Sequence, residues 1–257
     1  MTFTQGVLLF LAAMVAGMVN SIAGGGTLLS FPALVWIGVD PRVANATNSL
    51  ALAPGAFASL WGYRDAMSET PRRYFVLLIP GLIGGVLGGW LLARTPLRTF
   101  ERLVPWLVLF ATVLFTLQPI VQRWLRKTSH EHTKHQTSSQ WMLGAACYQF
   151  FTGVYGGYFG AGIGILLLAM LGVLGMTNLH QMNGLKNILA GAINLIAALY
   201  LITANLIHWQ AAGVMALGAL VGGYGMARVA QKLGQTFVRR AVIVIGFTLS
   251  AIFFWRS

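Results

Sequence analysis

The chain has 257 residues, of which 57% are hydrophobic and only 9% are charged. A soluble domain carries about 25% charged residues, so this composition excludes an ordinary soluble protein and indicates an integral membrane protein. The formal net charge of +12 would suggest a nucleic-acid partner in a soluble chain. Here the charges lie almost wholly between apolar segments, where they act as topology signals and lipid headgroup contacts.

Eight apolar segments follow one another, and a polar stretch divides them into two groups of four. They span roughly 6–38, 43–62, 74–94 and 103–122, and then roughly 141–175, 183–203, 208–228 and 240–255. Most are about 20 residues long, as spanning helices require, and they do not alternate with the period of strands. The sequence predicts an all-α integral membrane protein with three parts: a first transmembrane repeat (1–122), a polar cytoplasmic linker (123–140) and a second transmembrane repeat (141–257).

The opening segment is too long for one crossing and contains a run of glycines. Residues 6–38 would extend about 50 Å as a single helix, whereas the hydrocarbon core is about 30 Å thick. Three glycines, Gly24, Gly25 and Gly26, interrupt it, and each costs roughly 1 kcal/mol in a helix interior. A break there predicts two short helices that form a hairpin, re-entrant or barely spanning, and return the chain to its starting side.

The two halves also resemble each other. Residues of the first half recur 137 positions later in the pairs Gly81 and Gly218, Gly85 and Gly222, Gly88 and Gly225, Thr99 and Thr236, Phe100 and Phe237, and Arg102 and Arg239. At a spacing of 136, the pairs are Gly17 and Gly153, Gly24 and Gly160, and Gly26 and Gly162. Matches at a nearly fixed offset indicate an internal repeat. Because a returning hairpin leaves an odd number of crossings, we predict two inverted repeats, each a broken-helix hairpin plus three transmembrane helices.

The positions of lysine and arginine favour this topology. Returning hairpins would place twelve of them on one side: Arg64, Arg72, Arg73, Arg123, Arg126, Lys127, Lys134, Lys186, Arg228, Lys232, Arg239 and Arg240. The other side would hold five: Arg42, Arg94, Arg98, Arg102 and Arg256. A single crossing by each opening segment would divide them nine to eight. Cytoplasmic loops are the richer in Lys and Arg, so both termini are predicted to be periplasmic.

Acidic residues are scarce, and all five lie in loops or at segment ends: Asp40, Asp65, Glu69, Glu101 and Glu131. This placement argues against a paired-carboxylate hydrolase and against a carboxylate at the membrane midplane. No P-loop and no Ser–His–Asp set can be argued, so we expect no enzyme and no cofactor. The linker histidines are interpreted as part of a solvated segment rather than a metal site, and the single cysteine, Cys147, excludes an internal disulfide.

Polar residues near the breaks are mainly hydrogen-bond donors. They are Asn20, Ser21, Thr27, Thr47 and Asn48 in the first half, and Tyr158, Asn183, Lys186, Asn187 and Asn194 in the second. A broken helix adds free backbone N–H groups and a positive dipole end, so the set suits a small oxyanion. Alternatives stay open: the glycines could serve close packing, the asparagines could bond across helices, and Lys186 could snorkel to the cytoplasmic surface.

Two motifs resemble the sulfite exporter TauE/SafE family. The first is "GMVNSIAGGGTLLSFPALVWIGVDPRVANATNSLA" (residues 17–51), with a glycine-rich break, two prolines and then "ATN". The second is "GVYGGYFGAGIGILLL" (residues 153–168) with "NGLKN" (residues 183–187), which departs from the first by having Ala161 in place of a glycine and no counterpart of Pro32. The resemblance implies a bacterial inner-membrane permease for sulfite, organosulfonates or related small anions, in either direction.

Matching motif positions imply a substrate site at Gly24–Gly26, Thr47, Asn48, Gly160, Gly162, Lys186 and Asn187. With the neighbouring donors, the expected substrate-binding residues are Asn20, Ser21, Gly24, Gly25, Gly26, Thr27, Thr47, Asn48, Tyr158, Gly160, Gly162, Lys186 and Asn187. We expect a secondary anion transporter with the lipid bilayer and a small anion as partners. The alternatives are a passive anion channel and an uptake permease for another small organic anion.

Overall fold

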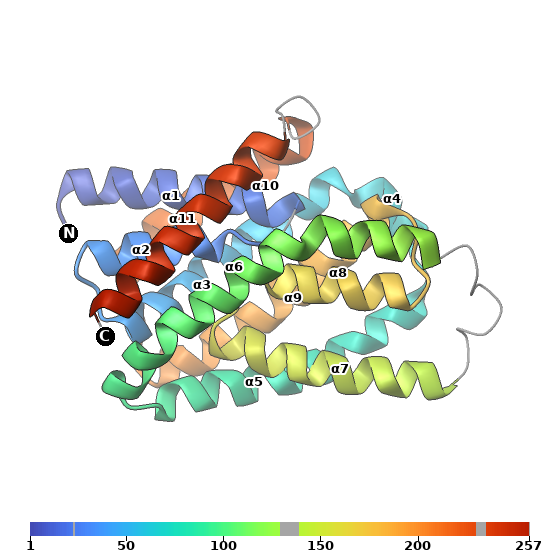
Figure 1. Ribbon diagram of the computed structural model, residues 1–257, viewed down its shortest axis with the longest axis horizontal. Coiled ribbons are helices and arrows are strands. Elements are labelled where there is room, and N and C mark those ends of the chain that lie inside the picture. The colour runs from blue at the N-terminus through green and yellow to red at the C-terminus, as the bar shows by residue number, and fades with distance from the viewer. Residues whose placement is uncertain (23, 129–138, 230–234, 257) are drawn as a thin grey trace.

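The computed structural model describes residues 1–22, 24–128, 139–229 and 235–256. All regular elements in these ranges are helices, which confirms the all-α class (Figure 1). The long helices are α1 (Phe3–Ile22), α2 (Thr27–Trp36), α3 (Pro41–Ser59), α5 (Leu78–Arg94), α6 (Leu97–Thr128), α7 (Ser139–Tyr158), α8 (Ile163–Val173), α9 (Leu179–Thr203), α10 (Trp209–Val229) and α11 (Gln235–Arg256). Three short elements connect α3 to α5: η1 (Leu60–Gly62), α4 (Arg64–Ser68) and η2 (Arg72–Leu77).

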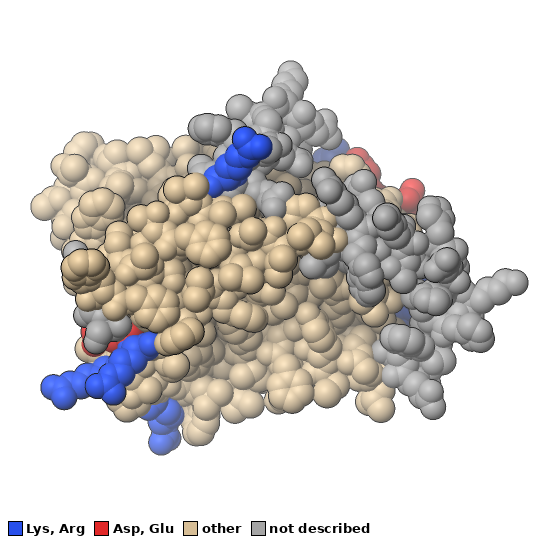
Figure 2. Space-filling model, in the orientation of Figure 1, with Lys and Arg blue, Asp and Glu red and all other residues tan. Residues whose placement is uncertain are grey.

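The exterior of the helical body suits lipid. Four described stretches are long and apolar enough to cross a membrane: Phe3–Ile22, Arg72–Arg94, Leu97–Ile120 and Leu179–Thr203. Large apolar side chains also face outward, such as Ile79 on α5 and Trp106 on α6, each 61% exposed. Figure 2 shows a largely uncharged surface with lysine, arginine and acidic side chains gathered toward its margins. The protein is therefore a multi-pass integral membrane protein.

The chain breaks where the glycines predict a break. The first arm, α1, has 20 residues and α2 has 10, which correspond to about 30 Å and about 15 Å of helix. Of the two predicted alternatives, α1 fits the barely spanning one, because it is just long enough to cross the hydrocarbon core, whereas α2 is too short to cross it. In Figure 1, α2 runs back beside α1, and the N- and C-termini lie at the same end.

Corresponding helices of the two halves begin and end with the same capping features. Left-handed glycines follow α1 and α7, at Gly24 (φ +80°) and Gly160 (φ +74°). Each donates its N–H to a carbonyl five residues earlier, which is a common way to close a helix. The third helices of the two halves, α3 and α9, each follow a residue whose side chain caps two N–H groups, Asp40 before α3 and Asn178 before α9. These matches support the predicted repeat.

The halves interlock instead of folding as separate bundles. The first helix of each half packs on the fourth long helix of the other, so α1 lies against α10 and α7 against α5. The third helices, α3 and α9, pack on each other, as do the last ones, α6 and α11. This reciprocal pairing is what a two-fold relation between halves requires, and it supports the inverted repeat, which stays a prediction.

Close packing explains the glycine-rich sequence of α5. A Cβ atom on Gly84 or Gly88 would collide with the α7 carbonyl of Phe150 or Val154. The interpretation that these glycines allow helices to approach closely is therefore confirmed.

We expect Gly88→Val to lower the stability of the protein, because the Val154 carbonyl belongs to backbone that cannot move aside. Overpacking costs about 1–3 kcal/mol, and for a chain of this size that lowers the melting temperature by several degrees. The matched control is Gly213→Val on α10, where an added Cβ meets nothing within 4 Å. Thermal unfolding of the two purified variants in detergent compares them, and equal melting temperatures would contradict the packing role.

The polar linker is only partly covered by the structure. Helix α6 continues to Thr128, inside the segment predicted as linker, and α7 begins at Ser139. The histidine cluster of residues 130–135 lies outside the described residues, as do two of the lysines counted for topology, Lys134 and Lys232. The division into two repeats and a linker therefore stays a prediction.

Candidate functional site

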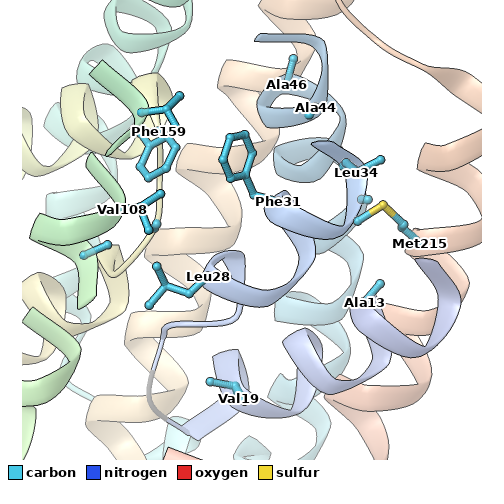
Figure 3. Close-up of a cluster of buried hydrophobic side chains, with 14 of the residues drawn as sticks. Ala13, Val19, Leu28, Phe31, Leu34, Ala44, Ala46, Val108, Phe159 and Met215 are labelled. Atoms are coloured by element: carbon cyan, nitrogen blue, oxygen red, sulfur yellow. The ribbon is translucent and has the colours of Figure 1, made fainter. Parts of the chain in front are cut away.

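The two chain breaks, one from each half, meet inside the molecule. A Cβ atom on Gly24 would lie 2.5 Å from Cα of Gly164, in the first turn of α8. Nearby in the chain, Phe31 of α2 packs edge-on against Phe159 of the second break, with ring centroids 5.4 Å apart, and Figure 3 shows these two rings facing each other. Backbone contact at this point requires glycine on both sides. The geometry therefore joins the hairpins of the two halves at their bends.

The C-terminal end of α1 accepts hydrogen bonds from Tyr63, between η1 and α4, and from two residues of α9. The Ser21 carbonyl accepts from the Tyr63 hydroxyl at 3.1 Å, from Lys186 Nζ at 3.3 Å and from Asn187 Nδ2 at 3.5 Å. The Asn20 carbonyl accepts from Lys186 Nζ at 2.9 Å. The last carbonyls of a helix lack partners within the helix and carry its negative dipole end. These donors satisfy them where the chain turns away.

Lys186 is a buried cation. Its side chain is 1% exposed, so the interpretation that it snorkels to the cytoplasmic surface is wrong, and it does not belong in a count of surface charges. Besides the two carbonyls, Nζ donates to Asn183 Oδ1 at 3.2 Å. The three acceptors are neutral, and none of the described ion pairs includes this lysine. A buried charge without a counter-charge is costly, and in a membrane it marks a functional site.

The start of α2 carries a second polar group. The Asn20 side chain accepts from the Gly26 N–H at 2.7 Å, so one residue connects both sides of the break. One turn further on, the buried Asn48 of α3 accepts from the Ser30 hydroxyl and donates to Thr27 Oγ1. Helix N-termini with polar side chains are ready-made anion sites. The break therefore has a cation on one side and a helix start on the other.

The glycines of the first break have different neighbours. An added Cβ on Gly26 would collide with the Ala16 carbonyl of α1, and one on Gly25 would lie 2.5 Å from two ring carbons of Phe115 on α6. Gly26 therefore allows close approach of two backbones, whereas Gly25 lies under a buried aromatic ring. Both interpretations of the glycine run are therefore supported: it allows close packing, and it breaks the helix.

Several predicted site residues lie elsewhere. Thr47 Oγ1 accepts from the His208 N–H at 2.9 Å, at the start of α10. The Tyr158 hydroxyl is 3.3 Å from Thr95 Oγ1, and its carbonyl accepts from Asn45. In the second break, Gly160 faces Asn194, whose Oδ1 has no hydrogen-bond partner, and Gly162 faces Ala111 of α6. No direct contact connects Thr47 or the Tyr158 side chain with Lys186 in the described hydrogen bonds.

Four further residues contact the first break or the side chains around it, and the sequence did not predict them. Ser59 accepts from Asn187 Nδ2 at 2.6 Å, so this asparagine does bond across helices, as one alternative held. Tyr63, Gly164 and Phe115 lie in contact with the break. Gly164 follows Gly160 and Gly162 at the same spacing of two, which is a readable signal. Nothing in the sequence around Tyr63 or Phe115 distinguishes them from other aromatic residues of the chain.

We expect Asn20→Asp to fold and to lose most of its anion transport. The carboxylate retains the acceptor for the Gly26 N–H but adds a negative charge in the turn whose carbonyl binds Lys186. An opposing charge of this kind reduces anion binding by at least about tenfold. The matched variant Asn20→Ala removes the cap, costs about 1 kcal/mol of stability and leaves the lysine charge free to act. Uptake by proteoliposomes and thermal unfolding separate the two effects; wild-type transport by Asn20→Asp would refute the role of charge.

We expect Gly25→Leu to abolish transport, because the new side chain enters the space of the Phe115 ring. Overpacking of this kind costs about 1–3 kcal/mol or more, and it displaces the break. The double variant Gly25→Leu/Phe115→Ala restores space and should recover part of the activity. Labelled-anion uptake by both variants measures this, and a fully active Gly25→Leu protein would show that the break serves only packing.

This chain is similar to known proteins over nearly its whole length. The model of the family described as "Sulfite exporter TauE/SafE" matches residues 9–253. A "Probable membrane transporter protein" of Haemophilus influenzae is 28% identical over 245 residues, covering 95% of this chain and 92% of that protein. The "Probable membrane transporter protein YfcA" of Escherichia coli K12 is 25% identical over 247 residues, covering 95% and 87%. No solved structure was found to match the chain.

Proposed function

Because the chain belongs to the sulfite exporter TauE/SafE family and is a membrane transporter, not an enzyme, we propose that it carries small sulfur-containing anions across the bacterial inner membrane. Sulfite and organosulfonates are the substrates favoured, and the mode is secondary transport by alternating access. The buried Lys186 at the junction of the two breaks is the observation that carries this proposal. A small oxyanion supplies the negative charge that the described surroundings of this lysine do not.

The anion binds beside Asn183 in this proposal. Lys186 Nζ donates to three acceptors. Two are backbone carbonyls of α1, and the third is the half-buried side chain of Asn183. Side-chain rotation can free one N–H of the ammonium without disturbing α1, and an anion oxygen then takes the place of Asn183 Oδ1. Hydrogen bonds to charged groups contribute about 1.5–3 kcal/mol each, so several donors are needed to replace the water that the anion loses.

In this proposal, movement of the two breaks against each other exposes the anion site alternately to the two sides of the membrane. The contact between Gly24 and Gly164 is the place where one hairpin can slide on the other, since neither residue has a side chain to interlock. Sites formed by broken helices between repeats are the usual arrangement in secondary transporters. This movement requires the inverted repeat, and the reciprocal packing of α1 on α10 and α7 on α5 supports it.

The rival candidates are a passive anion channel and an uptake permease for a different small organic anion. Counterflow separates a carrier from a channel: proteoliposomes loaded with unlabelled anion should accumulate labelled anion transiently only if a carrier is present. A panel of sulfite, sulfoacetate, taurine, thiosulfate and sulfate identifies the substrate. Linear, non-saturating flux without counterflow would favour the channel, and saturable uptake of none of these compounds would contradict the proposed substrate class.

The proposed orientation has both termini in the periplasm. The division of lysine and arginine between the two sides supports it, even with Lys186 removed from the count because it is buried. A C-terminal reporter that is active only in the periplasm should be active when fused after Ser257. A reporter that is active only in the cytoplasm would contradict this topology.

A further inference from the structure

The hydrogen bonds of Lys186 fit its protonated form. Nζ has three oxygen acceptors, at 2.9, 3.2 and 3.3 Å. A neutral amine has two N–H groups and an ammonium has three, so three acceptors fit the protonated form. The stem of the side chain is enclosed as well, because a Cβ on Gly164 would lie 3.2 Å from Lys186 Cδ. The contacts at the junction of the breaks therefore suit a positively charged ammonium group.

No acidic side chain of the surrounding described helices balances this charge. The elements that pack along α9 are α1, α3, α4, α5, α7, α8 and η1. Four of these, α1, α7, α8 and η1, contain no acidic or basic residue. The basic residues of α3 and α5 are Arg42 and Arg94, at the helix ends. Asp65 of α4 is the one carboxylate among these helices, and its side chain is 94% exposed and paired with Arg64 at 3.4 Å.

From this we propose that the site is built for one negative charge: it binds a monovalent anion, and the loaded carrier crosses the membrane as an electrically neutral unit. The inference rests on the proposed function and adds the charge class of the substrate. A monoanion cancels the lysine charge, whereas a dianion leaves one net negative charge in a region of low dielectric constant, where charge is costly. The empty carrier then moves with one positive charge and is the form on which membrane potential acts.

Exchange of anion for anion tests this, since only the loaded carrier moves during exchange. A net elementary charge that crosses 100 mV is biased by about fiftyfold, whereas a neutral unit is not biased. Proteoliposomes containing the full chain are held at zero or about −100 mV with a potassium gradient and valinomycin. The probes are monovalent methanesulfonate and isethionate, and divalent sulfate and ethane-1,2-disulfonate.

For the wild-type protein, self-exchange of a monovalent probe should change by less than about twofold with potential, and divalent probes should exchange at least about tenfold more slowly. Equal exchange of divalent probes, or monovalent exchange that changes more than about threefold with potential, would overturn the inference. A folded protein that exchanges no probe and none of the anions of the substrate panel would overturn the proposed function and the inference with it.

Two variants of Lys186 isolate the charge. In Lys186→Met the loaded carrier has a net negative charge, so any remaining exchange should become sensitive to potential, and in Lys186→Arg it should stay insensitive. The control is Arg98→Gln, which removes one exposed positive charge on α6 and should behave like the wild type. Potential-insensitive exchange at the wild-type rate in Lys186→Met, or sensitivity in a folded Lys186→Arg, would overturn the inference.

Discussion

Gly24→Ala should lose anion transport, whereas Gly38→Ala should retain it. Both glycines are left-handed, with φ +80° and +91°, so alanine has a similar backbone cost of about 1–2 kcal/mol at either position. Their surroundings differ: a Cβ on Gly24 would lie 2.5 Å from Gly164 Cα, whereas one on Gly38 meets nothing within 4 Å. Only Gly24→Ala therefore forces the two breaks apart.

Uptake of labelled anion by proteoliposomes, normalised to the amount of folded protein, measures the difference. We expect Gly24→Ala to fall by at least about tenfold relative to Gly38→Ala, since an overpacked contact costs about 1–3 kcal/mol. Because neither change affects a charge, this comparison tests the geometry of the junction separately from its electrostatics. Equal transport by the two variants would show that the contact between the hairpins is not needed for function.

Lys186→Met should weaken anion binding strongly with little loss of stability. Methionine is similar in length, so the space beside Gly164 stays filled, and the charge that an anion neutralises is removed. A hydrogen bond to a charged group contributes about 1.5–3 kcal/mol, which corresponds to about 10- to 100-fold in affinity. The carbonyls of Asn20 and Ser21 lose this donor, but Ser21 keeps Tyr63 and Asn187.

The control for Lys186→Met is Asn187→Leu, which removes an uncharged donor from the same carbonyl. Asn187 also donates to the Ser59 hydroxyl, which keeps its own bond to the Ala56 carbonyl, so the loss of Asn187 should lower stability by about 0.5–1.5 kcal/mol per lost hydrogen bond. We expect the two variants to differ in kind, with Lys186→Met impaired in binding and Asn187→Leu impaired in stability. The opposite pattern would identify Lys186 as a structural cap of α1.

The sequence alone predicted the broad architecture, because that architecture follows from simple lengths and compositions. A largely apolar segment of 33 residues (6–38) exceeds one crossing, and three glycines show where it divides. The structure has the bend there and a second bend at Gly160–Gly162. The interlocking of the two halves was not predictable in the same way, since α1 packs on α10 of the other half and local propensity has no information on such a contact.

The sequence predicted many residues of the site, but not which of them lie in contact. Thr47 and Asn48 are adjacent in α3, and successive helical residues point about 100° apart. Asn48 therefore faces Thr27 and Ser30, whereas Thr47 faces the start of α10. Tyr158 is close in sequence to the second break, which is why it was predicted as a site residue, but its hydroxyl lies beside Thr95. A motif gives neighbours along the chain, and helix phase decides which of them meet.

Equilibrium binding of a labelled anion to purified protein in detergent shows whether Lys186, at the junction of the two breaks, binds the transported anion. We expect saturable binding to the wild-type protein, competition by other small sulfur-containing monoanions, and an affinity at least about tenfold weaker in Lys186→Met, with both proteins folded. Equal affinity of the wild type and Lys186→Met for the same anion would contradict this role of Lys186.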